Sequence, residues 1–274
     1  LDGEDRMMRG GLVDHRLRGQ RIAVVGGGPA GMSAALERAR LGAEVTLFER
    51  NSALGGQFLL AQRIPGKFEF NETIRYFQTQ LHHLNVSVQL NTAATSELLA
   101  GYDEVVMATG VRPRMLNIPG SDRPEVVSYV DVLKGEVEVG HRVAIVGAGG
   151  IGFDVADFLT HDADAKGFMA SWGVDEDAEA QGGLASPQRT TSRRQVAMYQ
   201  RRPGKMGKGL GRTTGWIHRR TLKQRGVHQW SGVQYGFIDD DGFHVTLEDG
   251  TTHVQLVDHV VVCAGQLPFV PEGI

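Results

Sequence analysis

The chain has 274 residues, a length that suits two globular domains of ordinary size. Its 29 basic and 32 acidic residues give a net charge of −3, which excludes the strongly basic surface typical of nucleic-acid-binding proteins. The single cysteine, Cys263, excludes an intrachain disulfide, a thiolate zinc site and a self-contained iron–sulfur cluster. Because no apolar run approaches the ~18 residues of a membrane helix and no signal peptide opens the chain, we expect a cytoplasmic protein without membrane or nucleic-acid partners.

The first half of the chain predicts a strand–helix–strand unit. Residues 1–20 are polar and without a steady hydrophobic period, and they predict a linker or docking arm. Residues 22–25 then predict a buried parallel strand, followed by a helix from about residue 30 to 41 and a strand over residues 44–48. Later segments with apolar periodicity predict an amphipathic helix over 70–84 and strands over 86–90 and 104–108.

The same pattern restarts at Arg142 and indicates a duplicated domain. A strand is expected over residues 143–146 and a helix over 153–159, whereas residues 160–194 are weakly patterned and predict a surface insertion. The remaining expected elements are a strand over 195–199, a helix over 216–224, and strands over 233–238, 243–247, after Asp249-Gly250, and over 259–263.

A dinucleotide-binding fingerprint, Gly26-x-Gly28-x-x-Gly31, stands between the first strand and the first helix. The first glycine permits a sharp turn, the second lets a pyrophosphate approach the backbone, and the third lets the helix pack close to the strand. Glu49 ends the following strand, where a carboxylate can accept hydrogen bonds from a ribose hydroxyl. A glycine turn alone is also compatible with simple packing, but the whole pattern predicts a dinucleotide site. Pro29-Ala30 and Gly55-Gly56-Gln57 favour FAD there.

A second fingerprint, Gly147-x-Gly149-x-x-Gly152, also contains Gly150 and Ile151. The strand after its helix ends in arginines, Arg201 and Arg202, where an acid would bind a ribose. Guanidinium groups bind the 2′-phosphate of NADP, so the sequence favours NADP over NAD. The alternative is that these arginines belong only to a solvated basic loop.

The chain closely resembles the C-terminal half of the bacterial NADPH-dependent 2,4-dienoyl-CoA reductases, relatives of trimethylamine dehydrogenase. The likeness runs from about residue 21 to residue 268. Besides the two fingerprints, the stretches that carry it are Gly55-Gly56-Gln57-Phe58, Ile64-Pro65-Gly66-Lys67, Ser128-Tyr129-Val130-Asp131-Val132-Leu133, Gly182-Gly183-Leu184, Gly209-Leu210-Gly211-Arg212-Thr213-Thr214-Gly215-Trp216-Ile217-His218-Arg219 and Cys263-Ala264-Gly265-Gln266.

The resemblance implies an α/β fold with two tandem Rossmann-like domains of the glutathione-reductase-like FAD/NAD(P)-binding type. Residues 21–111 would bind FAD, residues 112–265 would bind NADP and carry the insertion near 160–194, and residues 266–274 would begin the return to the first domain. The implied FAD-binding residues are Gly26, Gly28, Pro29, Ala30, Gly31, Glu49, Arg50, Gly56, Gln57, Lys67, Ala94, Ala108, Thr109 and Gly110. The implied NADP-binding residues are Gly147, Gly149, Gly150, Ile151, Gly152, Arg201 and Arg202.

The resemblance also implies that NADPH reduces FAD in this portion, and that electrons then pass through a 4Fe-4S cluster to FMN in an N-terminal flavin barrel. The barrel, its FMN, the cluster and the residues that protonate the acyl-CoA substrate are expected upstream of Leu1. The segment that closes the first domain is expected after Ile274. We therefore expect an excised fragment of a longer enzyme of fatty acid beta-oxidation, with no catalytic residue of its own.

Two other classes remain open: an NADPH-dependent flavin oxidoreductase subunit of the glutamate-synthase or ferredoxin type, and a non-catalytic nucleotide-binding module. A disulfide reductase would carry a redox cysteine pair after its Gly-Gly turn, and residues 57–61 contain no cysteine.

Overall fold

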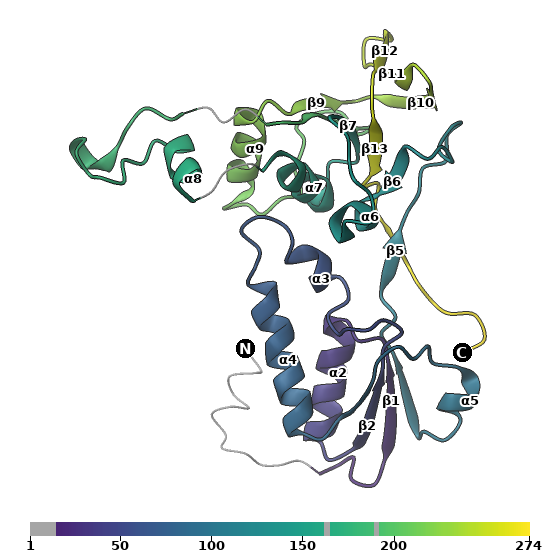
Figure 1. The fold of residues 1–274 in the computed structure, drawn as a ribbon. Helices are drawn as coiled ribbons and strands as arrows, with labels where there is room; N and C mark the ends of the chain where they lie inside the picture. Colours follow the sequence, from purple (N-terminus) through teal and green to yellow (C-terminus); the bar gives the residue numbers. More distant parts are fainter. Residues whose placement is uncertain (1–14, 162–164, 189–191) are drawn as a thin grey trace. The chain divides into compact units, whose positions relative to one another are not determined.

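The computed structural model of the protein describes residues 15–161, 165–188 and 192–274 (Figure 1). The chain divides into two compact units. Unit 1 holds the described residues up to Arg112 together with Pro268–Ile274, and unit 2 spans Pro113–Leu267. The chain passes between the units in two short paired strands, β5 (Val111–Pro113) and β14 (Gln266–Pro268). Among the described residues, no helix is long and apolar enough to cross a membrane.

Unit 1 contains a four-stranded parallel sheet in the order β3-β2-β1-β4. Its strands are β1 (Arg21–Val25), β2 (Glu44–Phe48), β3 (Ser87–Gln89) and β4 (Glu104–Met107). β1 is central because four consecutive residues, Ile22–Val25, are buried, as a parallel strand covered on both faces requires.

Alternate side chains of β1 supply two different cores. Ile22 and Val24 pack on the face covered by α2 (Pro29–Arg40) and α4 (Phe70–His83), which lie side by side in Figure 1. Ala23 and Val25 face a smaller cluster with Phe48 and with Leu99 of α5 (Ser96–Leu99). A short helix, α3 (Phe58–Ala61), packs against the start of α4.

Unit 2 contains a five-stranded parallel sheet in the order β6-β13-β7-β8-β9. Its strands are β6 (Val126–Ser128), β7 (Arg142–Val146), β8 (Gln195–Gln200), β9 (His228–Ser231) and β13 (His259–Val262). Three helices lie beside this sheet: α6 (Tyr129–Lys134), α7 (Gly150–Thr160) and α9 (Gly215–Gln224). α6 starts at a capping box between Ser128 and Asp131, because each residue bonds the backbone N–H of the other.

A three-stranded antiparallel sheet packs on one face of the parallel sheet of unit 2. It consists of β10 (Gln234–Asp239), β11 (Gly242–Thr246) and β12 (Thr252–Gln255). Its buried side chains share one core with those of the parallel sheet: Ala144, Val146, Ala197, Tyr199 and Val260 meet Val233, Ile238, Phe243 and Val245. The antiparallel strands therefore pack against the end of β8, near Tyr199.

The weakly patterned segment of unit 2 forms little regular structure. It contains α8 (Ala165–Ser171) and a 3₁₀ turn, η1 (Gln181–Gly183), which stand apart from the parallel sheet in Figure 1. Trp172 meets Trp216 of α9 edge-on, with 6.1 Å between the ring centroids.

The α/β class and the parallel sheets predicted from the sequence are confirmed, and most predicted elements differ from the observed ones by one or two residues. Residues 1–14 of the predicted arm lie outside the described residues. Leu17, which follows them, packs on the core of unit 1, and its N–H donates to the carbonyl of Leu41 at 3.0 Å.

Candidate functional site

The first glycine loop has a backbone that larger residues would disrupt. Gly26 has φ +110°, and a Cβ atom there would overlap with the carbonyl of Ala108. A Cβ on Gly31 would overlap with the carbonyl of Gly26, so the third glycine allows α2 to start directly against the turn. These two glycines are explained by packing within unit 1.

The middle glycine of this loop, unlike the other two, has open space around it. Gly28 has φ −75°, which any residue adopts, and a Cβ there would meet only Gly56 Cα, at 3.9 Å, among the described residues. Within the described chain, α2 has Gly28 as its N-cap residue and no side-chain cap, so the N–H groups of Ala30 and Gly31 lack a helical acceptor. A bare backbone at an uncapped helix start fits a pyrophosphate.

Glu49 is the one buried acid of the site, with 5 % of its surface exposed. Its Oε2 accepts a hydrogen bond of 2.7 Å from the N–H of Gly27, inside the glycine loop. Its Oε1 accepts bonds of 2.7 Å from both the backbone N–H and the side-chain Nδ2 of Asn51. Oε2 has further acceptor capacity, so the carboxylate can hold the loop and still accept from a ribose hydroxyl.

Other residues predicted to bind FAD lie around the returning segment of the chain. The guanidinium of Arg50 lies over the ring of Phe269, 5.3 Å from its centroid. The Thr109 hydroxyl donates to the carbonyl of Phe269, and the N–H of Phe269 donates to the carbonyl of Gly110 at 2.9 Å. The Thr109 hydroxyl is therefore engaged by the protein itself. Ala94 packs beside β1 in the smaller core of this unit.

The Gly-Gly turn approaches the first loop closely. Gly56 has φ +51°, and a Cβ there would lie 2.9 Å from Gly28 Cα. Gln57 precedes α3, and the N–H of Lys67 donates to the carbonyl of Ile64 at 2.9 Å in the turn after it. The turn thus brings Gly56 close to Gly28.

The second glycine loop repeats the first. Gly147 has φ +113°, and Cβ atoms on Gly147 and Gly152 would overlap with the carbonyls of Cys263 and Gly147. Gly149 and Gly150 are exposed, and no atom of the described residues lies within 4 Å of a Cβ placed on either. α7 begins there, without a side-chain cap from the described residues, so the N–H of Ile151 lacks a helical acceptor. This loop also fits a pyrophosphate.

Strand register defines which residue of unit 2 corresponds to Glu49. The N–H of Gly26 donates to Phe48 at 2.8 Å, and the N–H of Gly147 donates to Tyr199 at 2.9 Å. The residue after Tyr199 is Gln200. The expectation that an arginine stands at the acid's position is therefore corrected: a neutral amide stands there, and Arg201 and Arg202 follow it.

The two arginines of unit 2 are exposed but have different neighbours. The guanidinium of Arg201 lies over the ring of Tyr235, 5.7 Å from its centroid. The carbonyl of Arg202 accepts from Gln200 Nε2 at 2.7 Å and from the N–H of Gly232 at 3.3 Å. Both cationic side chains therefore follow a strand end at which the position equivalent to Glu49 holds no carboxylate.

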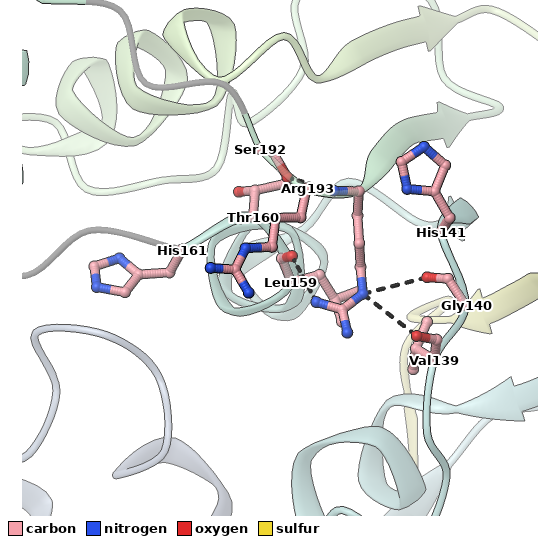
Figure 2. A pocket seen from close by; sticks show the side chains of 9 residues that line it. Val139, Gly140, His141, Leu159, Thr160, His161, Ser192 and Arg193 are labelled. Carbon is pink, nitrogen blue, oxygen red and sulfur yellow. Dashed lines mark hydrogen bonds between the residues drawn. The ribbon is translucent and has the colours of Figure 1, made fainter.

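A cavity of about 390 Å³ lies at the other end of this sheet, before the starts of β7 and β8 (Figure 2). Arg194 lines this cavity and donates to the carbonyls of Val139, Gly140 and Leu159 at 3.2 to 3.4 Å. The guanidinium binds the last turn of α7, where a cation is favourable. This cavity is separate from the glycine loop.

Sequence reasoning missed Asn51, Gln200 and Tyr235. The first two follow strand ends and could have been found from register, since each is one or two residues from a predicted site residue. Tyr235 stands 34 residues after Arg201 on another sheet, and nothing in the sequence signals their contact. Cys263 is buried, and burial together with the charge of Asp154 raises the pKa of its thiol, so it is no nucleophile.

The sequence pattern of the pyridine nucleotide-disulphide oxidoreductase family matches residues 20–270. A cinnamate reductase from Clostridium sporogenes is 39% identical over 142 residues, which cover 51% of this chain and 21% of that protein. A metal reductase from Desulforamulus reducens is 28% identical over 255 residues, or 89% of this chain and 37% of that protein. The solved structure of a 2-naphthoyl-CoA reductase with 2-naphthoyl-CoA has a TM-score of 0.74 and 25% identity, covering 92% of this chain and 34% of that one. The chain thus spans about a fifth to just over a third of these relatives.

Proposed function

Because the chain belongs to the pyridine nucleotide-disulphide oxidoreductase family, we propose that it is the FAD- and NADPH-binding portion of a larger flavoenzyme of the 2,4-dienoyl-CoA reductase type. Family membership makes it an FAD- and NAD(P)-dependent oxidoreductase module. The assignment of NADPH to unit 2 rests on the difference between two equivalent strand ends. Unit 1 has the buried carboxylate of Glu49 there, and unit 2 has Gln200 followed by Arg201 and Arg202.

FAD fits unit 1 because of the bare backbone at Gly28 and the free acceptor capacity of Glu49. Glu49 would bind a ribose hydroxyl and keep the glycine loop in place through Gly27. The residues assigned to this cofactor are Gly26, Gly28, Pro29, Ala30, Gly31, Glu49, Arg50, Gly56, Gln57, Lys67, Ala94, Ala108, Thr109 and Gly110.

NADPH fits unit 2 because a 2′-phosphate at this strand end would meet arginines and no buried carboxylate. A module that only held FAD for structure would have no use for such arginines. The residues assigned to NADPH are Gly147, Gly149, Gly150, Ile151, Gly152, Arg201 and Arg202. When bound, the two cofactors supply a two-electron donor and an acceptor that can release electrons singly.

We propose an acyl-CoA substrate for the larger protein. The specific substrate would be a 2,4-dienoyl thioester of fatty acid beta-oxidation. The similarity to a 2-naphthoyl-CoA reductase supports a CoA thioester, whereas the similar cinnamate and metal reductases act on other acceptors. Substrate choice therefore belongs to a part of the protein other than this chain. FMN and a 4Fe-4S cluster belong to the same proposed part, together with a flavin barrel.

The test is the reduction of the flavin itself. The chain would be loaded with FAD and mixed without oxygen with NADPH or NADH, and bleaching of the flavin absorbance would be followed. We expect NADPH to act at least about tenfold faster at low concentrations, since loss of a bidentate phosphate contact costs about 1.4 kcal/mol or more. Equal rates would overturn the NADP assignment, and a chain that takes up no flavin would overturn the FAD assignment.

A further inference from the structure

Tyr235 of β10 connects the arginine end of β8 with the second glycine loop. We propose that Tyr235 is a positioning residue that sets the preference for a 2′-phosphorylated nucleotide by holding the Arg201 guanidinium at the end of β8. The proposal deepens the proposed function and rests on its assignment of NADP(H) to unit 2.

Both ends of the Tyr235 side chain have a defined contact. Its ring lies under the Arg201 guanidinium at 5.7 Å, within the range of a cation–π interaction. Its hydroxyl donates a hydrogen bond of 3.1 Å to the carbonyl of Tyr199. The same carbonyl accepts the N–H of Gly147 at 2.9 Å. One tyrosine thus fixes the arginine relative to the loop predicted to bind the pyrophosphate.

The ring itself is held rigidly. It packs against Phe243 with 5.7 Å between centroids, and Phe243 in turn meets Tyr199 at 5.2 Å. Burial raises the pKa of Tyr235 to about 12, although the charge and backbone N–H of Arg201 oppose this shift. The hydroxyl therefore stays protonated at neutral pH and remains a donor to Tyr199.

A fixed ring matters because an exposed arginine loses rotamer freedom when it binds a phosphate. Stacking on Tyr235 restricts Arg201 before the nucleotide arrives, so less freedom is lost on binding. NAD has no 2′-phosphate and gains nothing from this restriction. Loss of the ring should therefore weaken NADP and leave NAD unchanged.

The experiment measures dissociation constants of NADP⁺ and NAD⁺ by calorimetry for the whole chain and its variants. Tyr235→Leu removes the ring, and Tyr235→Met is the second variant because its unbranched chain fills the same space more adaptably. We expect either to raise the NADP⁺ dissociation constant about threefold to fivefold, the value of an exposed cation–π contact, with NAD⁺ within about twofold. Tyr235→Phe keeps the ring under Arg201 and loses only the bond to Tyr199, so it should weaken the preference less than Tyr235→Leu.

Two controls make the result specific. Phe269→Leu removes the aromatic partner of Arg50 in unit 1 and should leave the NADP⁺ preference unchanged. In an Arg201→Gln background, Tyr235→Leu should have no further effect on the ratio of the two constants.

The outcomes separate this inference from the proposed function. A wild-type chain that binds both nucleotides equally overturns the NADP assignment and the inference with it. A wild-type chain that prefers NADP⁺ while Tyr235→Leu and Tyr235→Met keep that preference, or weaken both nucleotides alike, overturns the inference alone.

Discussion

The N–H of Gly147 donates a hydrogen bond of 2.9 Å to the carbonyl of Tyr199, the last residue before Gln200. Gly26 makes the same bond to Phe48, the last residue before Glu49, at 2.8 Å. The two bonds make Gln200 and Glu49 equivalent. Unit 2 has a neutral amide where unit 1 has a buried carboxylate, a difference of one charge at the position proposed to meet a ribose.

Gln200→Glu should therefore convert unit 2 toward NAD. A carboxylate at this position can accept from a ribose 2′-hydroxyl but repels a 2′-phosphate. We expect the NADP⁺ dissociation constant to rise about tenfold or more, while that of NAD⁺ stays equal or falls. Gln195→Glu, at the exposed start of the same strand, is the matched control, and binding of both nucleotides by calorimetry is the measurement. An unchanged NADP⁺ constant would show that Gln200 does not face the ribose.

Glu49→Ala should destabilise unit 1 and release FAD. The substitution leaves the buried N–H of Gly27 without its acceptor, and it also removes the acceptor of two donors of the exposed Asn51. We expect a loss of about 1 to 3 kcal/mol in the free energy of unfolding for such unpaired donors. Thermal unfolding and the flavin absorbance report the two effects. Glu44→Ala changes the exposed first residue of the same strand, and an equal loss there would contradict the assignment.

Alanine at two glycines of the second loop should separate binding from folding. Gly149 has φ −80° and open space around it, so Gly149→Ala should fold normally but obstruct the pyrophosphate and weaken NADP⁺. A Cβ on Gly152 would overlap with the carbonyl of Gly147, so Gly152→Ala should cost about 2 kcal/mol or more of stability. Unfolding in urea and NADP⁺ titration distinguish the two variants. A Gly149→Ala chain with full affinity would remove the phosphate from this loop.

Acid should weaken the link between the starts of β7 and β13. The Arg142 side chain and its backbone N–H, at 2.7 Å, bond the Asp258 carboxylate and lower its pKa to about 2. Because the folded pKa lies below the unfolded value of about 3.9, this stabilisation is complete above that value and is lost as pH falls toward about 2. Asp258→Asn should lower the free energy of unfolding by about 1 kcal/mol at neutral pH and by progressively less below pH ~4. For Asp241→Asn, in an exposed turn, the difference from wild type in the free energy of unfolding should not change with pH.

Much of this protein was predictable from local sequence. The buried run Ile22–Val25 and its glycine turn need only near neighbours, because four apolar residues followed by Gly-Gly-Gly-Pro have few other stable arrangements. The helix over Phe70–His83 was equally readable from its apolar period. Short elements such as β6 and α5 were not, since strands and helices of three or four residues carry too little periodicity.

Some site residues could also be recognised from the sequence, whereas others could not. Glycines whose Cβ would overlap with the adjacent turn, Gly31 and Gly152, reveal themselves by spacing alone, because their role is local. Strand register makes Gln200 in unit 2 the counterpart of Glu49 in unit 1, and it depends on which strands pair in each sheet. The stacking of Arg201 on Tyr235 likewise depends on how the two sheets of unit 2 pack. Only the tertiary structure decided these, since hydrogen bonds between strands and contacts between sheets join residues that no sequence period connects.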